Sequence, residues 1–267
     1  MEKIYNNPEI NYLKIVDYLG IEKGDTILVS SDLLNLFSKE FETTGNLPDV
    51  NKFIDSFIEK VGPEGTLLFP TYNWDFCKGV PFNWKKTKGK TGSLGNACLK
   101  RKDFKRTKHA LYSFAVTGKD KDLLCDMDFS DSFGPDSVFA YLDHKHAKQV
   151  IIDVHLTHCF TFVHYVEEMI LPEIEYRYIK NFTGEYIDEN QESSTKTFSM
   201  FVRDLDKDVE KCYDPIENEF IETGVADHIL INGIPFIVFP DIHNTVEPIL
   251  HDIRFNRSRK IGTFRGQ

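Results

Sequence analysis

The first half of the chain alternates between strand-like and helix-like segments, and this constrains its fold most. Residues 26–29 (TILV) and 66–71 (TLLFPT) are short apolar runs typical of buried strands, and residues 114–117 and 150–154 are further strand candidates. Residues 12–19 have helical spacing, and residues 51–61 carry their large apolar side chains on one helical face. The alternation predicts an α/β fold, with a sheet covered by helices.

The second half contains more polar segments and one clear turn. Residues 188–196 are strongly polar, so we expect a hairpin or exposed excursion near residues 181–215. Asn232 and Gly233 interrupt strand-like alternation over residues 225–239, which indicates a β-hairpin. Residues 254–267 form a basic tail that we expect to be partly disordered. Without repeats or obvious linkers, the sequence predicts one domain spanning residues 1–267, with a C-terminal lobe.

Composition narrows the classes of partner. The formal net charge of −10 argues against nonspecific nucleic-acid binding and suits a cationic substrate, although acidic proteins often owe their charge to solubility. The five cysteines include no CxxC pair, which is typical of reduced cytoplasmic thiols. With no signal-peptide pattern at the N-terminus and no apolar run of membrane-spanning length, we expect a cytoplasmic protein without membrane contact.

The most informative candidate site follows the strand at residues 150–154. Thr161, His164 and Glu167 or Glu168 recur at spacings of three or four and share one helical face. A carboxylate can fix the tautomer of an imidazole, which can then accept a substrate proton. The alternative is a helix start with a capping hydroxyl and a core histidine.

Three other segments offer candidate binding residues, each with a structural alternative. Ser30 and Ser31 lie where a strand gives way to a helix, so they either contact a pyrophosphate or cap the helix. Trp74 and Asp75 follow a buried strand and either hold an ammonium or pack and cap a turn. The third segment contains Arg106, Thr107 and Ser113, and it either binds phosphates or forms a solvated basic loop.

The sequence lacks the motifs that are typical of metal-dependent enzymes and of serine hydrolases. Neither HExxH nor a recognised facial triad accompanies His144, His146, His155, His158 and His164, so we expect no metal site. No GxSxG nucleophile elbow is present.

Taken in order, these segments resemble the aminoglycoside 3-N-acetyltransferase family, also called the antibiotic N-acetyltransferase family. The resemblance rests on residues 24–33 (GDTILVSSDL), 61–71 (VGPEGTLLFPT), 106–118 (RTKHALYSFAVTG), 133–137 (FGPDS) and the TxxHxxE of residues 161–167, within about residues 10–240. Ser30 stands where the family commonly has histidine, Ala110 replaces a usual proline, and Asp153 and His155 occupy a usually glycine-rich stretch. Residues 176–184 look more like members encoded with surface-sugar biosynthesis.

The resemblance implies a mixed central sheet flanked by helices and transfer of an acetyl group from acetyl-CoA to a primary amine on an amino sugar. His164 would be the general base, with Thr161 donating to the thioester oxygen or sulfur. Glu167 is the nearest orienting carboxylate, and Glu185, Asp188 and Asp214 stay open as alternatives. For acetyl-CoA we expect Ser30 and Ser31 at the pyrophosphate, and Arg106, Thr107 and Ser113 along the arm or phosphates. Asp75 and Trp74 would receive the amine.

Two other functions stay open. One is a catalytically inactive protein of the same fold that binds CoA or sugar, and the other is a metal-dependent hydrolase. The acceptor, whether an aminoglycoside, a nucleotide-linked amino sugar or another amine, is left open by the sequence, as are the acyl group and the oligomeric state.

Overall fold

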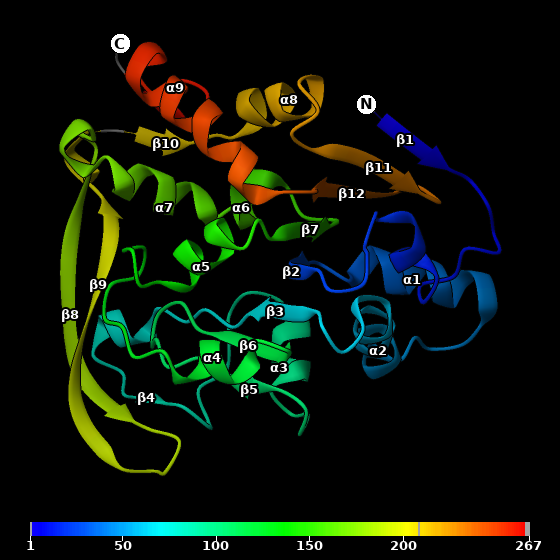
Figure 1. Ribbon diagram of the computed structural model, residues 1–267, viewed down its shortest axis with the longest axis horizontal. Coiled ribbons are helices and arrows are strands. Elements are labelled where there is room, and N and C mark those ends of the chain that lie inside the picture. The colour runs from blue at the N-terminus through cyan, green and yellow to red at the C-terminus, as the bar shows by residue number, and fades with distance from the viewer. Residues whose placement is uncertain (1, 208, 265–267) are drawn as a thin grey trace.

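The computed structural model describes residues 2–207 and 209–264, and within them a mixed eight-stranded sheet forms the centre of the molecule (Figure 1). Its strand order is β1 (Glu2–Tyr5), β11 (Asp227–Ile231), β12 (Ile234–Phe239), β7 (Lys148–Ile152), β2 (Thr26–Ser31), β3 (Thr66–Pro70), β6 (Phe114–Gly118) and β5 (Lys105–Arg106). β2 runs parallel to both β3 and β7, whereas β12 and β6 are antiparallel to their neighbours. The sheet expected from the alternating sequence is therefore present.

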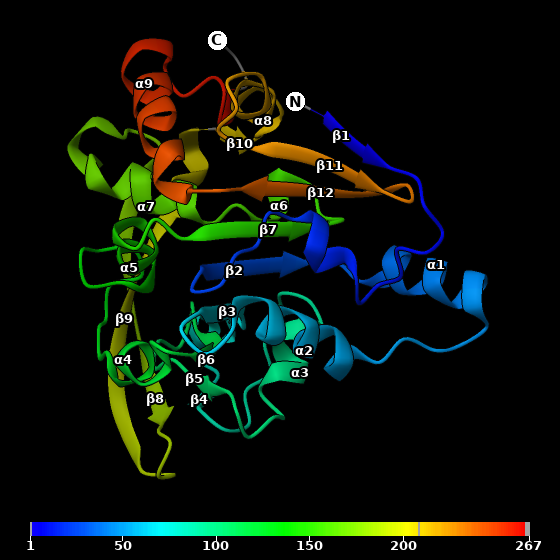
Figure 2. The same ribbon diagram turned by 45° about the vertical axis from the view of Figure 1, so that its right-hand side comes forward.

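Helices cover both faces of this sheet (Figure 2). The α-helices are α1 (Leu34–Thr44), α2 (Val50–Val61), α3 (Leu94–Cys98), α4 (Lys121–Asp126), α5 (Val138–His144), α6 (Leu156–Cys159), α7 (Phe162–Met169), α8 (Asp214–Glu222) and α9 (Val246–Asn256). The short 3₁₀ helices are η1 (Ile15–Tyr18), η2 (Asp75–Lys78), η3 (Leu171–Glu173), η4 (Leu205–Lys207) and η5 (Ile242–Thr245). Residues 12–19 have helical spacing in the sequence, but the structure forms only the short 3₁₀ helix η1 there.

Alternate side chains of each central strand enter two separate cores. In β2, Ile27 and Val29 pack with α1, α2 and α3, whereas Leu28 packs with α5, α7 and α9 on the opposite face. β3 follows the same alternation, with Leu67 and Phe69 on the first face and Leu68 on the second. Because both faces are covered, these strands read as continuous apolar runs in the sequence.

The carboxyl ends of β2, β3 and β7 lie at one edge of the sheet, because these parallel strands share a direction. The next residues are Asp32 after β2, Thr71 after β3 and Asp153 after β7. Ligand sites in sheets of this kind gather at such an edge.

Two β-hairpins shape the second half of the chain. β11 and β12 join through Asn232 and Gly233, whose φ angles of 50° and 84° suit the type I′ turn expected there. β8 (Arg177–Ile187) and β9 (Ser193–Arg203) form a long hairpin along one side of the molecule, and β8 also pairs with β4 (Phe82–Asn83) (Figure 1). The polar residues 188–192 form the hairpin turn.

The C-terminal residues are more ordered than the basic composition suggests. Residues 254–256 complete α9, and β13 (Gly262–Phe264) pairs with β10 (Val209–Lys211). Since β11 and β12 belong to the central sheet, the expected C-terminal lobe is continuous with it. The last three residues of the predicted tail, 265–267, lie outside the described part of the chain.

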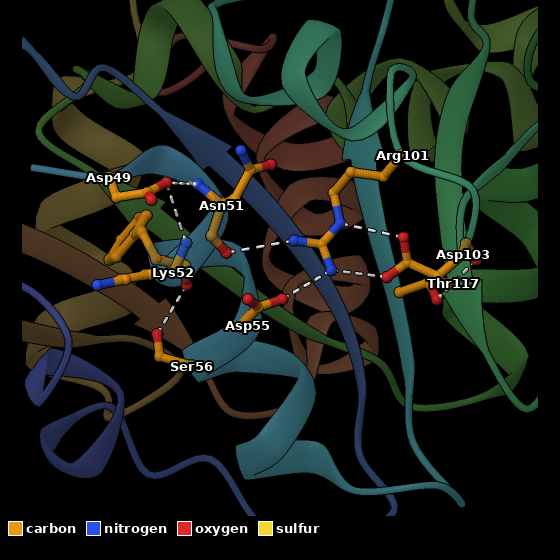
Figure 3. Close-up of polar contacts among 9 residues, drawn as sticks. Asp49, Asn51, Lys52, Asp55, Ser56, Arg101, Asp103 and Thr117 are labelled. Atoms are coloured by element: carbon orange, nitrogen blue, oxygen red, sulfur yellow. Dashed lines mark hydrogen bonds and ion pairs between the residues drawn. The ribbon is translucent and has the colours of Figure 1, made fainter.

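The partly buried guanidinium of Arg101 fixes α2 to the segment that follows α3 (Figure 3). Arg101 pairs with Asp55 at 2.6 Å and with Asp103 at 2.7 Å, and its Nη1 donates to the carbonyl oxygen of Asn51 at 3.2 Å. Asp49 caps α2 by accepting from the backbone N–H of Asn51. These contacts fix α2 relative to α3, both of which line one of the cavities described below.

Within residues 2–207 and 209–264, no helix has the length and apolar character needed to cross a bilayer.

Candidate active site

A cavity of about 700 Å³ opens at the carboxyl ends of β2, β3 and β7. Its lining includes Ser30 and Ser31 from β2, Tyr72 and Trp74 beyond β3, and several side chains from α6 and α7. We call this cavity the histidine pocket, because it contains both His158 and His164.

α7 places His164 in the wall of the histidine pocket. The Nδ1 atom of His164 lies 2.7 Å from Oε2 of Glu167, one helical turn further along. Glu167 is a carboxylate that only accepts, so Nδ1 carries the proton and donates it in this hydrogen bond. Nε2 is therefore left with the lone pair, which is the nitrogen a general base needs.

Glu167 is the centre of a buried polar network. Besides His164, the carboxylate accepts from Tyr176 at 2.9 Å and forms an ion pair with Arg177 at 2.9 Å. Burial opposes the charge of Glu167, but Arg177 and His164 together hold its pKa below the usual value. The sequence offered four carboxylates as partners of His164, and Glu167 is the one that contacts its imidazole. Glu185 instead bonds Ser193, Asp188 accepts within the hairpin turn, and Asp214 pairs with His155.

The imidazole of His164 is neutral in this environment. Burial, followed by the nearby guanidinium of Arg177, lowers the pKa of His164 to about 4, although the contact with Glu167 acts in the opposite direction. The ordinary pKa of a histidine is about 6.5. The pKa of His164 is lower because burial in the pocket and the charge of Arg177 both disfavour the imidazolium.

Thr161 immediately precedes α7 and lines the histidine pocket. Its side chain makes no capping hydrogen bond to the helix, so the capping alternative does not hold. The hydroxyl instead contacts the buried Tyr72 hydroxyl, which also lines the pocket. Thr161 and His164 therefore face the same space.

The pocket also contains a thiol, that of Cys159. Burial raises the pKa of Cys159 to about 12, with the nearby Glu217 adding to the effect. The thiolate is the nucleophilic form of cysteine, so this thiol is inert at neutral pH.

The residues expected to bind a cofactor separate into two groups. Ser30 and Ser31 line the histidine pocket. Arg106, Thr107 and Ser113 are buried and outside its lining. Arg106 donates to Ser113 and to the carbonyl oxygens of Thr71, Trp84 and Thr87, which makes it an internal anchor. Thr107 likewise accepts from the backbone N–H of Phe114.

Only one of the two residues expected to bind the amine lies in the histidine pocket. Trp74 lines the histidine pocket, but Asp75 does not. The Asp75 carboxylate lies 2.5 Å from Nζ of Lys90, and this hydrogen bond lowers the pKa of Asp75. Because its charge is already compensated by Lys90, Asp75 is a poor receptor for a substrate ammonium.

A second cavity of about 990 Å³ adjoins the histidine pocket and shares Asp32, Leu33 and Ser93 with it. We call it the lysine cavity after its basic side chains, which are Lys85, Lys86, Lys88 and Lys100. Apolar side chains from α1 and the segment after it complete the wall, including Phe41 and Leu47, which are 47% and 84% exposed.

Sequence reasoning missed three polar contributors to this site: Tyr176, Arg177 and Lys211. Tyr176 and Arg177 fall in the stretch that departs from the best-known family members, and an adjacent tyrosine and arginine were the available signal. Lys211 gave no local signal, because only the pairing of β10 with β13 fixes the segment that carries it. In the described ranges, no three His, Cys, Asp or Glu side chains cluster as metal ligands would.

Comparison with known proteins identifies relatives over most of the chain. A family model described as aminoglycoside 3-N-acetyltransferase matches residues 38–242. The chain is similar to the solved structure of aminoglycoside acetyltransferase AAC(3)-Xa, with 19% identity, a TM-score of 0.72, and coverage of 91% of this chain and 90% of that one. No curated protein matches the sequence.

Two further solved structures carry ligands. AAC-IIIb, solved as a binary complex with CoASH, has 18% identity, a TM-score of 0.74, and coverage of 92% of this chain and 97% of that one. AAC-VIa, solved with bound sisomicin, has 18% identity, a TM-score of 0.73 and the same coverage of both chains. At these identities the structural likeness shows the fold, and it confirms the mixed α/β architecture expected from the sequence.

Proposed function

This chain belongs to the aminoglycoside 3-N-acetyltransferase family, and from that premise we propose that it is an acetyl-CoA-dependent N-acetyltransferase acting on a primary amine of an amino sugar. The observation that carries the proposal is the His164–Glu167 pair, in which Nδ1 and Oε2 are 2.7 Å apart in the wall of the histidine pocket. The acceptor is an amino sugar of an aminoglycoside or of surface-polysaccharide biosynthesis.

His164 is the general base of this proposal. An alkyl ammonium has a pKa of about 10 and must lose a proton before its nitrogen attacks a thioester. Nε2 of neutral His164 accepts that proton, while Glu167 stabilises the imidazolium that forms. The imidazolium then gives this proton to the departing thiolate sulfur, and the second proton that the nitrogen loses as the amide forms passes to solvent, so His164 is neutral again.

Thr161 stabilises the charge that develops during transfer. Its hydroxyl lies on the same pocket wall as His164 and is not used in capping α7. Donation to the thioester oxygen or to the leaving sulfur strengthens as either atom gains charge. Holding both substrates in one pocket lowers the barrier without a covalent intermediate, and the un-ionised thiol of Cys159 supports direct transfer.

The residues of the lysine cavity fit acetyl-CoA, which supplies the acyl thioester. Lys85, Lys86, Lys88 and Lys100 offer cations for phosphates, and the exposed Phe41 and Leu47 offer an apolar surface for a flat base. Ser30 and Ser31 line the adjoining pocket at the end of β2 and are proposed to contact the pyrophosphate. The solved complex of AAC-IIIb with CoASH supports this co-substrate.

The test is release of free thiol from acetyl-CoA in the presence of candidate amines. Aminoglycosides and nucleotide-linked amino sugars are assayed in parallel, and the acetylated product is identified by mass spectrometry. We expect thiol release that depends on the amine. Absence of release with every amine, while coenzyme A still binds, would instead favour an inactive binding protein of the same fold.

A further inference from the structure

The histidine pocket carries positive charge although the whole chain carries a formal net charge of −10. Lys90 and Lys211 line it, whereas Asp32 is the one carboxylate among its described lining residues. Asp32 also lines the lysine cavity, so it belongs to the junction between the two spaces. The part of the pocket that the lysine cavity does not share thus lacks an acidic side chain in its described lining.

Most cations around this pocket already have a counter-charge. Lys90 is paired with Asp75 at 2.5 Å, and Arg177 is paired with Glu167 at 2.9 Å. Neither is therefore free to compensate the charge of a ligand fully.

Lys211 is the exception. It ends β10 and contacts β13 through the backbone, and its ammonium has no acidic partner within residues 2–207 and 209–264. Partial burial and the neighbouring Arg177 lower the pKa of Lys211, even though its side chain remains accessible to solvent. Lys211 is also near enough to His164 to contribute to the lowered pKa of the imidazole. A cation without an acidic partner among the described residues therefore lines the same pocket as the proposed base.

An anionic group in the pocket would compensate the excess positive charge of its lining, whereas additional cations would increase that excess. Like charges a few ångströms apart repel strongly in a cavity partly shielded from water. An acceptor with several ammonium groups would add positive charge to a pocket lined by Lys211, and Asp32 at the junction is the one carboxylate in its described lining.

We infer that the acceptor is an amine that also carries an anionic group, a phosphate or a carboxylate, and that Lys211 binds this group while His164 deprotonates the amine. The inference rests on the proposed function and specifies its substrate class. In the proposed function, acetyl-CoA extends from the lysine cavity past Ser93 to Ser30 and Ser31, and the amine acceptor takes the part of the histidine pocket that Lys211 lines and the lysine cavity does not share. The amino sugars that fit are hexosamine phosphates, nucleotide-linked amino sugars and amino sugar acids. Polycationic aminoglycosides do not fit.

The experiment compares matched acceptors by thiol release at fixed ionic strength. The amines are glucosamine, glucosamine 1-phosphate, a uridine diphosphate-linked amino sugar, muramic acid and sisomicin. We expect wild-type kcat/KM to be at least about tenfold higher for an anionic amine than for glucosamine or sisomicin. Comparing glucosamine 1-phosphate, the nucleotide-linked sugar and muramic acid identifies which anionic group the pocket prefers. Equal or greater activity with glucosamine or sisomicin would overturn the inference and leave the acetyltransferase proposal intact.

Three lysine variants assign the effect to one side chain. Lys211→Gln should reduce the preference for the anionic amine about tenfold, and Lys211→Arg should retain it. Lys207→Gln is the matched control, because Lys207 is an exposed lysine four residues earlier that does not line the pocket. An unchanged preference in Lys211→Gln would contradict the assignment.

A binding arm separates the two proposals if no amine is turned over. Calorimetry with glucosamine 1-phosphate in saturating coenzyme A measures the acceptor site alone. Binding that weakens about tenfold in Lys211→Gln would uphold the anion site while the catalytic proposal fails. Absence of binding to the wild-type protein would overturn the anion site itself.

Discussion

At the residue scale, Glu167 determines the state of His164. Its carboxylate holds Nδ1 at 2.7 Å and is itself held by Tyr176 and Arg177, so the imidazole has one tautomer and one orientation. Arg177 has opposing effects, because it keeps Glu167 ionised yet disfavours a second positive charge on His164. The site therefore holds a neutral base that gains its proton only when an acceptor supplies one.

Replacing Arg177 tests this balance. In Arg177→Gln, removal of the nearby cation should raise the pKa of His164 from about 4 toward the ordinary value of about 6.5. Burial remains, so the pKa should stay below 6.5. NMR titration of the His164 ring in both proteins measures the change. A pKa that stays the same or falls would show that Arg177 does not set the state of the imidazole.

Arg106 is expected to act on stability. Its guanidinium is 1% exposed, donates to Ser113 and to three carbonyl oxygens, and lies over the Phe82 ring at 4.7 Å. Arg106→Met leaves those acceptors without a donor and should lower the free energy of unfolding by about 3 kcal/mol or more. Denaturant unfolding measures this loss, with the exposed Arg259→Met as control.

The affinity for coenzyme A distinguishes the two roles of Arg106. Once the folded fraction is corrected for, we expect the Kd to be unchanged. A stable variant with greatly weakened coenzyme A binding would restore the cofactor role first expected for this arginine.

Some contacts of the candidate site were predictable from sequence and others were not. The contact between Glu167 and His164 was predictable because the two residues lie three apart on the same helix. Arg106 and Asp75 were assigned to ligands because their compensating groups come from elsewhere, the carbonyl oxygens of other loops for Arg106 and Lys90 for Asp75. A sequence displays charge but does not display whether a distant group neutralises it.

At the element scale, local patterns located the strands, while their assembly required the structure. β2, β3 and β6 were expected within one or two residues of their bounds, because both faces of the sheet are covered and each strand is continuously apolar. The turn at Asn232 and Gly233 was predictable from its need for positive φ. The return of β11 and β12 to the edge of β7, by contrast, depends on contacts far apart in sequence.

α3 bears a glycine whose small size sets the wall of the histidine pocket. A Cβ atom at Gly95 would lie 2.3 Å from the carbonyl oxygen of Pro70 and 2.9 Å from the Thr71 side chain. Gly95→Ala should therefore push α3 away from β3, lower stability by about 1–3 kcal/mol and raise the KM for acetyl-CoA. Thermal unfolding and steady-state kinetics check both effects. Wild-type values for both would mean that α3 accommodates the methyl group without moving the pocket wall.

At the scale of the whole molecule, total charge and site charge have opposite signs. The net charge of −10 suggested a cationic substrate, yet lysines outnumber carboxylates in the described lining of both adjoining cavities. The acidic residues that produce the total lie mainly elsewhere, where they favour solubility. Net charge is thus a poor guide to the ligand of this chain.

Ionic strength should affect the binding of acetyl-CoA through the lysines of the lysine cavity. Raising the salt concentration from about 0.02 M to about 0.5 M shortens the screening length several-fold, so the KM for acetyl-CoA should rise. Lys86→Gln should raise the KM at low salt and weaken its salt dependence. Initial rates at several salt concentrations measure both, and a KM indifferent to salt would contradict a role for the lysine cavity in holding phosphates.

The central claim is that His164 removes the proton from the acceptor amine. The most direct test measures amine-dependent thiol release and coenzyme A binding in His164→Gln, with His144→Gln on the exposed end of α5 as control. General-base catalysis accounts for about 10²–10⁴ in rate, so turnover should fall by that factor while the Kd for coenzyme A stays within about twofold. Near-wild-type turnover in a folded His164→Gln protein would contradict the claim.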